Sequence, residues 1–434
     1  MEGSTAWLGW LVQGAGHELM LFASVGILLF GLDDLLFDAL WFGAGRARRD
    51  AVRGRNPVSG TVAVFVPAWR EAAVLPATLT HILRSWDGED VRLYVGCYPN
   101  DAATLMAVAP LVARDRRVRL VIGPAAGPTT KGDNLNRMWH ALGEDERAEG
   151  RRFAAVVLHD AEDRVHPAEI ALYRVHLAQD AMVQIPVVPH YEPARNALSL
   201  LAIERGGDPF RADSLAEDYE VGMLLDAFGL SARFVDAVDG DGTRIVSRGE
   251  FPARVEAAAR QKARWVVGIA LAGWDHVAWP AARPDDGPRG ASRAWAARWM
   301  LWRDRRAPLA AIVILAAYIG MILAGLAMAG EALFGWSAVD IGDTLRWLLA
   351  FNAVLLLWRL SMRFLFTARC YGLRAGFAAV PRAFVANLIA VLAARRAIAC
   401  YWTMQRSGRV VWDKTDHPAV EAPRPLLLSE AWLR

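Results

Sequence analysis

The length and charge of the chain exclude several classes of protein. Its 434 residues suffice for one catalytic domain with additional elements and are too many for a small disulfide-stapled module. The 49 Lys and Arg residues against 46 Asp and Glu give a net charge of +3, which provides no broad basic field for nucleic acid. Hydrophobic residues make up 54% and there are 18 tryptophans, so we expect part of the chain to lie in or against lipid.

The first apolar stretch, Leu19 to Phe42, has acids in its second half: Asp33, Asp34 and Asp38. In one interpretation the membrane-buried part stops near Leu32 and the acidic part is an interfacial helix, with its acids facing water or protein; in the other the whole stretch spans. A signal peptide is not expected, because no basic leader precedes the stretch. The positive-inside bias predicts a cytoplasmic chain after it, because five arginines follow: Arg46, Arg48, Arg49, Arg53 and Arg55.

Short apolar runs then alternate with helical stretches. The runs are Thr61–Pro67, Val91–Cys97, Val118–Gly123 and Phe153–Asp160, and the helical stretches between them are Glu71–Ser85, Asp101–Arg114 and Asp133–Leu142. This pattern predicts an α/β domain with a mostly parallel sheet covered on both faces. Ligands of such open sheets bind beyond the carboxyl ends of the strands. The polar residues that follow each run are therefore candidates for a site.

Two of these candidates can be read in more than one way. The acids of His159-Asp160-Ala161-Glu162-Asp163 suit Mg²⁺ or Mn²⁺ bound also to a diphosphate, and an acidic strand end can equally be a solvated loop. Lys131 follows small polar residues at a helix start, where it could meet phosphate oxygens, although the segment also reads as ordinary helix capping with Asp133. It is not a P-loop, because GxxxxGK[ST] is absent.

Two later helices carry further candidates. Glu217 and Asp218 begin an amphipathic helix, either as a capping box with Ser214 or with one carboxylate as general base for an attacking hydroxyl. Gln261, Arg264 and Trp265 share a helical face that could hold a diphosphate and stack a sugar, or could anchor a juxtamembrane helix.

The C-terminal third predicts two further membrane spans. Ala307 to Gly330 is uncharged and long enough to cross a hydrocarbon core, and a second span covers about Leu345 to Phe366. Phe377 to Ile398 carries three arginines and favours a helix in the membrane plane. With three spans, the tail is cytoplasmic. The three cysteines form no CxxC pair, which fits a reducing, cytoplasm-facing catalytic part.

The ordered motifs resemble family 2 glycosyltransferases with a GT-A fold, in the membrane-integrated branch that includes cellulose synthase and hyaluronan synthase. Within that branch the closer resemblance is to the phage-adsorption protein B group of the bacterial inner membrane. The resemblance covers nearly the whole chain and rests on ten segments: GLDDLLFDALWF, VPAWRE, VGCYPND, GPTTKGDNLN, LHDAED, QIPVVP, SLAEDYEVGMLL, RQKARWVVGI, LWRDRRAP and VVWDKTDH.

The resemblance implies roles for these residues. Donor contacts would come from Glu71, Asp101, Lys131 and Asp160, the base would be Asp218 beside Glu217, and diphosphate and acceptor would meet Gln261, Arg264 and Trp265. The metal, Mg²⁺ or Mn²⁺, would be held by Asp160 with Glu162 or Asp163, and the choice between the last two stays open because the motif has one acid more than DxD.

The expected organisation has four parts. An N-terminal membrane helix with an interfacial acidic stretch (1–45) precedes the cytoplasmic GT-A domain (46–306), two transmembrane helices (307–368), and an interfacial amphipathic helix with a cytoplasmic tail (369–434). Two departures from the resemblance stand out. Only Ala194 to Asp213 lies between the segment VVPHYEP and the acidic helix that begins with SLAEDYE, where the family has a longer acceptor-side segment. In addition, no cyclic-dinucleotide-sensing domain is expected after VVWDKTDH.

Three functions follow as hypotheses. The first is an inverting, metal-dependent transferase that adds sugar from a nucleotide-diphosphate donor, such as a UDP-sugar, to a growing glycan at the cytoplasmic face of the inner membrane. It would be processive and would export an exopolysaccharide. The second is a catalytically silent membrane scaffold that serves an envelope export or phage-adsorption partner. The third is a single-addition transferase acting on a lipid carrier.

Overall fold

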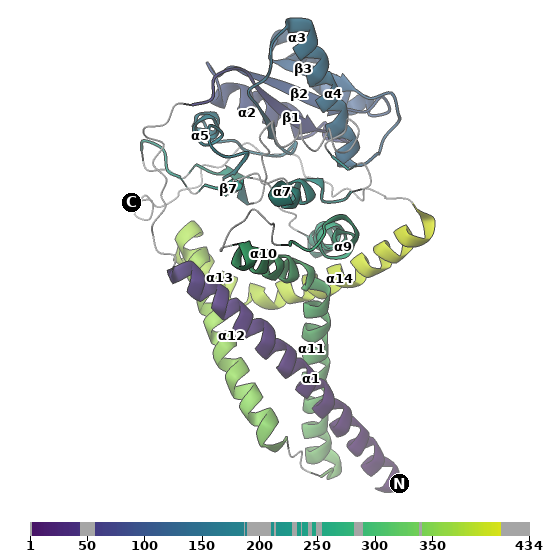
Figure 1. Cartoon of the computed structure of the whole chain (residues 1–434). Helices are drawn as coiled ribbons and strands as arrows, with labels where there is room; N and C mark the ends of the chain where they lie inside the picture. Colours follow the sequence, from purple (N-terminus) through teal and green to yellow (C-terminus); the bar gives the residue numbers. More distant parts are fainter. Residues whose placement is uncertain are drawn as a thin grey trace. The chain divides into compact units, whose positions relative to one another are not determined.

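The computed structural model describes residues 2–43, 57–185, 187–188, 210–211, 214–227, 232–235, 237–241, 245–248, 254–281, 290–337 and 341–408 (Figure 1). The segment Ala194 to Asp213, which is shorter than its counterpart in the family that the sequence resembles, lies almost wholly outside these described residues. The chain forms two compact units. One consists mainly of Met1–Ala47 and Arg303–Arg395, and the other of Arg48–Trp302 and Arg396–Leu427.

The second unit contains the predicted parallel sheet. Its strands are β1 (Val62–Pro67), β2 (Val91–Cys97), β3 (Val118–Ile122) and β4 (Ala155–Leu158), in the order β3-β2-β1-β4. All three pairings are parallel. Every residue of the central strand β1 is buried, because helices cover both faces. The α/β fold class predicted from the uninterrupted apolar runs is thus confirmed.

Two hydrophobic clusters cover the two faces of this sheet. Alternate residues of β1 point to opposite sides: Val64 packs with Leu79 of α2 (Leu75–Ser85), and Phe65 packs with Leu135 of α4 (Lys131–Glu149). Figure 1 shows α2 and α4 flanking the strands. Helices α3 (Ala102–Arg114) and α5 (Glu169–His176) complete the coverage of the sheet.

Helix α4 begins at Lys131, two residues earlier than the sequence pattern predicts. The hydroxyl of Thr130 accepts a hydrogen bond from the backbone N–H of Asp133 at 3.2 Å, which caps the first turn. The side chain of Asn134 donates to the carbonyl of Gly96 at the end of β2, at 3.0 Å. A Cβ at Gly96 would lie 2.2 Å from Asn134, so only glycine allows this close approach. The start of α4 is thereby fixed to the carboxyl end of the sheet.

The remainder of this unit has short strands and several helices. Strand β5 (Met182–Gln184) pairs with β7 (Ala232–Phe234), and β6 (Val187–Val188) pairs with β8 (Ser247–Arg248). The helices are α7 (Glu217–Ala227), α8 (Val255–Trp265), α9 (Gly273–His276) and α10 (Gly290–Arg305). A π-helical segment, η1 (Val266–Leu271), joins α8 to α9.

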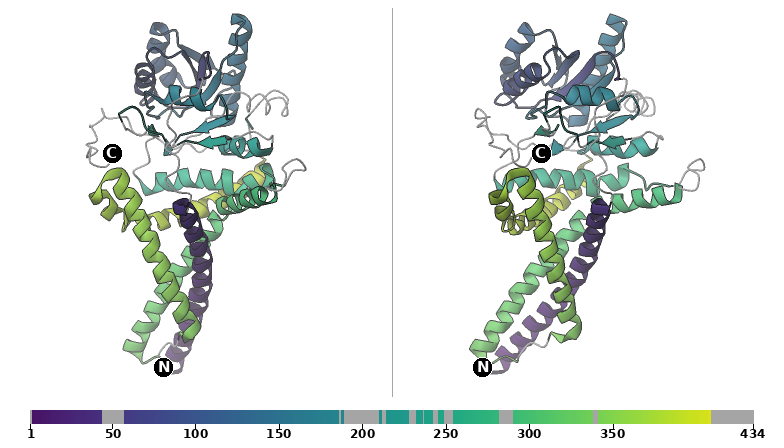
Figure 2. Two further views of the ribbon diagram at one scale, coloured as in Figure 1. Left: turned by 60° about the vertical axis from the view of Figure 1, so that its left-hand side comes forward. Right: turned by 90° about the vertical axis from the view of Figure 1, so that its left-hand side faces the viewer.

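The first unit is helical. Its helices are α1 (Glu2–Gly43), α11 (Ala307–Phe334), α12 (Gly342–Tyr371), α13 (Leu373–Ala379) and the first half of α14 (Arg382–Ser407), and Figure 2 shows α1, α11 and α12 running alongside one another. In the described chain, α1, α11, α12 and α14 are long and apolar enough to cross a membrane. By that measure α14 could also span, so its placement in the membrane plane stays a prediction.

Small residues allow α1 and α11 to approach closely. A Cβ on Gly26 of α1 would lie 2.7 Å from the side chain of Val313, and one on Gly320 of α11 would lie 2.8 Å from Met20. Backbone contact at glycine is a common basis for helix association in lipid, where apolar burial gives little drive.

The acids of α1 lie against arginines of the same unit. One oxygen of Asp33 is 2.8 Å from Arg306 and also pairs with Arg303. One oxygen of Asp34 is 2.7 Å from Arg306 and 3.0 Å from Arg303. Helix α1 continues through this stretch to Gly43, and of the two environments considered, water or protein, these two acids meet protein. The charges therefore join α1 to the segment around the start of α11.

We predict that Asp33→Asn combined with Asp34→Asn destabilises the helical unit. The double variant removes both counter-charges from two partly buried guanidinium groups, which should lower the melting temperature in detergent by roughly 5 °C. The matched control is Asp343→Asn, because its ion pair with Arg346 is largely exposed, with 88% and 59% of the side chains accessible. Equal melting temperatures for the double variant and the control would contradict the assigned role of the acids.

Candidate active site

Two predicted donor-site acids lie just beyond strands β1 and β2. Asp101 caps α3 and accepts a hydrogen bond from the backbone N–H of Arg70 at 2.6 Å. Arg70 has a left-handed backbone with φ 57°, which an arginine adopts only when its surroundings hold it there. The N–H of Glu71 donates to Thr104 at 3.0 Å. Glu71 and Asp101 are thus buried at the same sheet edge, in a turn fixed by backbone hydrogen bonds.

An aromatic pair lies beside this turn, of which the sequence pattern indicated Trp69, after the first strand, but not Tyr98. Trp69 and Tyr98 meet edge to face with ring centroids 5.1 Å apart, and the Tyr98 hydroxyl lies 2.8 Å from that of Thr129. A Cβ on Gly127 would lie 2.7 Å from Tyr98 and 2.8 Å from Trp69. Asn100 holds Gly127 through two reciprocal hydrogen bonds of 2.7 Å. The position of each aromatic just after a strand was the available signal.

Lys131 brings together three segments that are far apart in the sequence. Its ammonium nitrogen lies 2.9 Å from Asp160 Oδ1 and 3.4 Å from Glu217 Oε1. Burial favours the neutral amine, but the charges of Asp160, Glu217 and Asp218 outweigh it and hold the pKa of Lys131 well above its ordinary value. The next residue, Gly132, allows the carbonyl of Arg211 to approach, since a Cβ there would lie 2.4 Å from it.

Glu217 and Asp218 differ in their surroundings. Glu217 is buried, and burial raises its pKa to about 7, against the opposing effect of Lys131. Asp218 is partly exposed and accepts a hydrogen bond from the N–H of Tyr219 at 2.8 Å. The Ser214 hydroxyl donates to Glu220 at 2.6 Å, so the capping box of Ser214 with Glu217 is not the arrangement seen. Glu217 pairs with Lys131 instead.

Asp163 belongs to a buried network behind the site. Its Oδ2 accepts hydrogen bonds from the backbone N–H of Asp160 at 2.9 Å and from His159 at 3.0 Å. The other nitrogen of His159 lies 3.3 Å from Glu169, which accepts from Tyr173 at 2.5 Å. Burial lowers the pKa of His159, but the bonds to Asp163 and Glu169 raise it more, to about 10. The side chain of Asp163 is 0% exposed and pairs with His159, so Asp163 as a metal ligand stays a prediction, and Glu162 is the more accessible of the two acids.

The remaining acids, Asp160 and Glu162, do not form a metal site by themselves. Among the described residues, no group of three or more His, Cys, Asp or Glu lies close enough together to hold an ion by itself. Asp160 and Glu162 are both partly exposed, and Asp160 lies beside Lys131 at the start of α4. One or two carboxylates are what Mg²⁺ usually takes from a protein when substrate phosphates and water supply its other ligands. The donor set therefore fits a metal that arrives with a diphosphate.

The predicted acceptor-side residues lie at the end of α8. Arg264 is in the last turn, and Trp265 keeps 38% of its surface exposed. The π-helical segment that continues α8 packs Gly268 against Ala216, the residue before Glu217. Helix α8 is thereby connected to the acidic start of α7.

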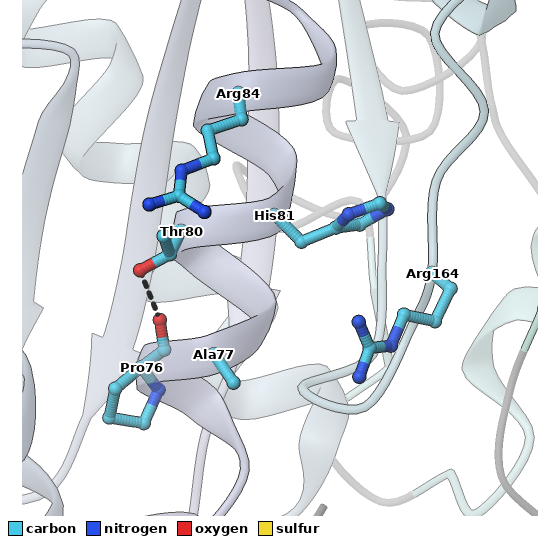
Figure 3. Close-up of a pocket in the computed structure, with 6 residues that line it drawn as sticks. All are labelled: Pro76, Ala77, Thr80, His81, Arg84 and Arg164. Atoms are coloured by element: carbon cyan, nitrogen blue, oxygen red, sulfur yellow. Dashed lines mark hydrogen bonds between the residues drawn. The ribbon is translucent and has the colours of Figure 1, made fainter. Parts of the chain in front are cut away.

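A hollow on the second unit contains none of the candidate residues. It has a volume of about 510 Å³, and Figure 3 shows its lining: Pro76, Ala77, Thr80, His81, Arg84 and Arg164. The imidazole of His81 is 3.0 Å from the carbonyl of Val165, and the Thr80 hydroxyl donates to Pro76. These bonds explain His81 and Thr80 as supports of α2, and the hollow is not the site of the chemistry.

Comparison with known sequences identifies the family. Residues 59–205 match the description "Glycosyltransferase like family 2", and residues 195–395 match "Glycosyl transferase family group 2". The chain belongs to glycosyltransferase family 2.

The chain is also similar to two curated proteins and to a solved structure. It is 28% identical to bacteriophage adsorption protein B of Escherichia coli K12 and to bacteriophage N4 adsorption protein B of Escherichia coli O157:H7, over 91% of this chain and 61% of each relative. The chain thus spans less than two thirds of these relatives. A mannosyltransferase of Pyrobaculum calidifontis, solved with GDP-Man and Mn²⁺, is 17% identical with a TM-score of 0.51, over 89% of this chain and 99% of that one. This likeness confirms the GT-A fold.

We predict that Asp163→Asn destabilises the glycosyltransferase domain even when all metal is removed. The variant weakens the buried pairing of His159, which should cost about 3 kcal/mol and several degrees of melting temperature in EDTA. Glu162→Gln is the matched control, because Glu162 is partly exposed. If Asp163 were a metal ligand, its replacement would matter only in the presence of Mn²⁺ or Mg²⁺.

We predict a pH-dependent difference in stability between the wild type and Glu217→Gln. The folded pKa of Glu217, about 7, exceeds its ordinary value of 4.5, so the folded state binds the proton more tightly in this window. The wild type should lose stability relative to the variant as pH rises from about 4.5 to 7, and the difference should then level off. Melting temperatures of both proteins across this range test it. A difference that grows in favour of the wild type would contradict the assignment.

Proposed function

We propose that the chain is a membrane-integrated, inverting glycosyltransferase that uses a nucleotide-diphosphate sugar. The observation that carries the proposal is the contact of Lys131 with both Asp160 and Glu217. A cation between carboxylates from separate segments, at the carboxyl edge of a GT-A sheet, is the arrangement that a site for a diphosphate and an attacking hydroxyl requires.

The donor would bind along the edge formed by β1, β2 and β4. Glu71 and Asp101 stand where a nucleoside could meet fixed polar groups, and Asp101 is held by two backbone N–H groups. Lys131, in the first turn of α4, adds its charge to that of the helix N-terminus, which favours phosphate oxygens. Asp160 and Glu162 would hold Mg²⁺ or Mn²⁺, which would neutralise charge on the leaving diphosphate.

Asp218 would remove the proton of the acceptor hydroxyl. It is partly exposed, whereas Glu217 is buried against Lys131, so Asp218 is the better placed of the two to meet an incoming sugar. Glu217 would hold the lysine in position. Gln261, Arg264 and Trp265 would bind the diphosphate and the acceptor, since a guanidinium suits phosphate oxygens and an exposed indole suits a sugar face.

The membrane helices support a more specific setting. The arginines that follow α1 favour an inner-membrane protein with its catalytic domain in the cytoplasm. A membrane-embedded transferase could extend a glycan processively from a UDP-sugar and pass the exopolysaccharide outward, with lipid and an envelope export protein as partners.

A second candidate function is a silent membrane component that keeps the fold. It is favoured by the printed names of the relatives, which describe phage adsorption and not sugar transfer. This function predicts that the purified protein binds a nucleotide without forming any glycosidic product. Transfer by the wild type therefore separates the two candidates.

We predict that membranes containing the wild type incorporate label from one of a panel of UDP- and GDP-sugars with Mn²⁺, and that EDTA abolishes incorporation. Asp218→Asn should reduce the rate about 100-fold or more, because general base catalysis is typically worth about 10²–10⁴ in rate. Asp87→Asn, an exposed acid on a turn after α2, is the control and should not differ from the wild type. Equal rates for wild type and Asp218→Asn would reject Asp218 as the base.

A further inference from the structure

The π-helical segment η1 touches the backbone that precedes the acidic turn of α7. A Cβ built on Gly268 would lie 2.6 Å from the Cβ of Ala216 and 3.0 Å from both the Ala216 nitrogen and the Leu215 carbonyl carbon. Real Cβ atoms are not found that close to other atoms, so no larger residue fits here without movement. Gly268 is also buried. The contact therefore brings two backbones close together, with only the methyl group of Ala216 between them.

The residues on either side of this contact bear the proposed chemistry. Glu217 and Asp218 follow Ala216 immediately, and Arg264 and Trp265 precede Gly268 by about one turn. The helix has a π-helical turn here: the N–H of Ala272 donates to the carbonyl of Val267, five residues earlier in the chain, at 2.7 Å. Such insertions in a helix often occur at functional sites, where they shift one part of the helix relative to the next.

A chain of hydrogen bonds strengthens the junction between η1 and the start of α7. The Ser214 hydroxyl accepts from the N–H of Ala216 at 3.1 Å and donates to Glu220 at 2.6 Å. The same carboxylate oxygen lies 2.7 Å from Nδ1 of His276, in α9. Glu220 is almost fully buried, and it connects the loop before α7 to the helix after η1. Two independent contacts thus hold α7 on the segment that continues α8.

A small apolar cluster excludes water from the junction. Ala216 and Tyr219 of the α7 region are buried with Val277 after α9 and Leu301 of α10, and Met223 and Ile269 pack against them. The cluster is separate from the two that cover the sheet. The start of α7 is therefore packed on η1 and α10 as well as paired with Lys131 of the sheet domain.

We propose that Gly268, Glu220 and His276 are positioning residues that set the Glu217–Asp218 turn relative to the Gln261, Arg264 and Trp265 face of α8. The inference rests on the proposed function, since it assigns the two sides of the junction to acceptor activation and to binding. A displacement of about 1 Å in such a geometry can lower a rate by about 100-fold. Rigid contact at a glycine prevents that displacement.

The first test is Gly268→Ala in the full chain. Alanine favours a helix over glycine by about 1 kcal/mol, so any loss reflects the clash with Ala216 and not a weaker helix. We expect turnover with saturating donor to fall about tenfold or more, while the Kd for UDP with Mn²⁺ changes less than about twofold. Gly143→Ala in α4 is the matched control, because a Cβ there meets nothing within 4 Å. Turnover of Gly268→Ala equal to that of this control would overturn the proposal.

The second test is rescue by removal of the clashing atom. Ala216→Gly combined with Gly268→Ala deletes the partner of the 2.6 Å contact and should restore part of the lost turnover, since two contacts of 3.0 Å remain. Ala216→Gly alone should stay close to the wild type. A double variant no faster than Gly268→Ala would show that the effect does not pass through Ala216, and would overturn the proposal.

A pair of variants at His276 tests the hydrogen-bond chain of Ser214, Glu220 and His276. His276→Ala removes the group that meets Glu220 and should lower turnover, whereas His276→Asn places an amide near the position of Nδ1 and should retain most of it. A role limited to stability would lower the melting temperature in His276→Ala without changing turnover of the folded fraction. That result, or equal losses in both variants, would overturn the positioning role of His276.

Hydrogen exchange gives a readout that does not depend on transfer. Amides of residues 214–220 should exchange faster in Gly268→Ala than in the wild type, with those of β1 and β2 unchanged. Unchanged exchange at 214–220 would overturn the proposed contact, whatever the activity. If the wild type transfers no sugar, both the proposed function and the positioning role fail; if it transfers and Gly268→Ala matches it, only the positioning role fails.

Discussion

The contact of Lys131 with Asp160 and Glu217 is the interaction on which the site depends. Without a cation, the carboxylates of Asp160, which follows β4, and Glu217, which begins α7, would repel one another. Lys131 reaches them because α4 begins at this residue, under the Thr130 cap and beside Gly96 at the end of β2. The Thr130 cap and the close approach at Gly96 therefore fix the ammonium group of Lys131 at the edge of the sheet.

The charge of this cluster also limits what it can bind. One lysine faces Asp160, Glu217 and Asp218, so the cluster is negative even when Glu217 is protonated, which its pKa of about 7 allows near neutrality. A diphosphate would bring further negative charge. Its binding there needs positive charge beyond Lys131, which a divalent ion on Asp160 would supply, with the helix N-terminus of α4 contributing a smaller part. Metal, donor and lysine would then depend on one another for binding.

The sequence predicted the fold and the place of the site more fully than the roles within it. Continuous apolar runs predicted buried parallel strands. Because ligands of open sheets bind beyond the carboxyl ends of the strands, the sequence also predicted that Glu71, Asp101, Lys131 and Asp160 lie at one edge. It could not tell Asp163 from its neighbours, because local order does not reveal that its carboxylate turns inward to His159. Nor could spacing show that Ser214 bonds Glu220, since both partners of a capping box were present. These outcomes depend on tertiary contacts.

Asp33 and Asp34 of α1 illustrate the same limit in the helical unit. Read alone, acids in an apolar helix suggest an end to the buried segment, because a charge in hydrocarbon is costly. Arg303 and Arg306 change that expectation, since they follow 270 residues later and supply matched guanidinium groups. A chain can keep acids within a long apolar helix when a distant segment brings the counter-charge, so the acids and the arginines must assemble together. The pairing thereby specifies which helix α11 joins, which apolar surfaces in lipid could not specify by themselves.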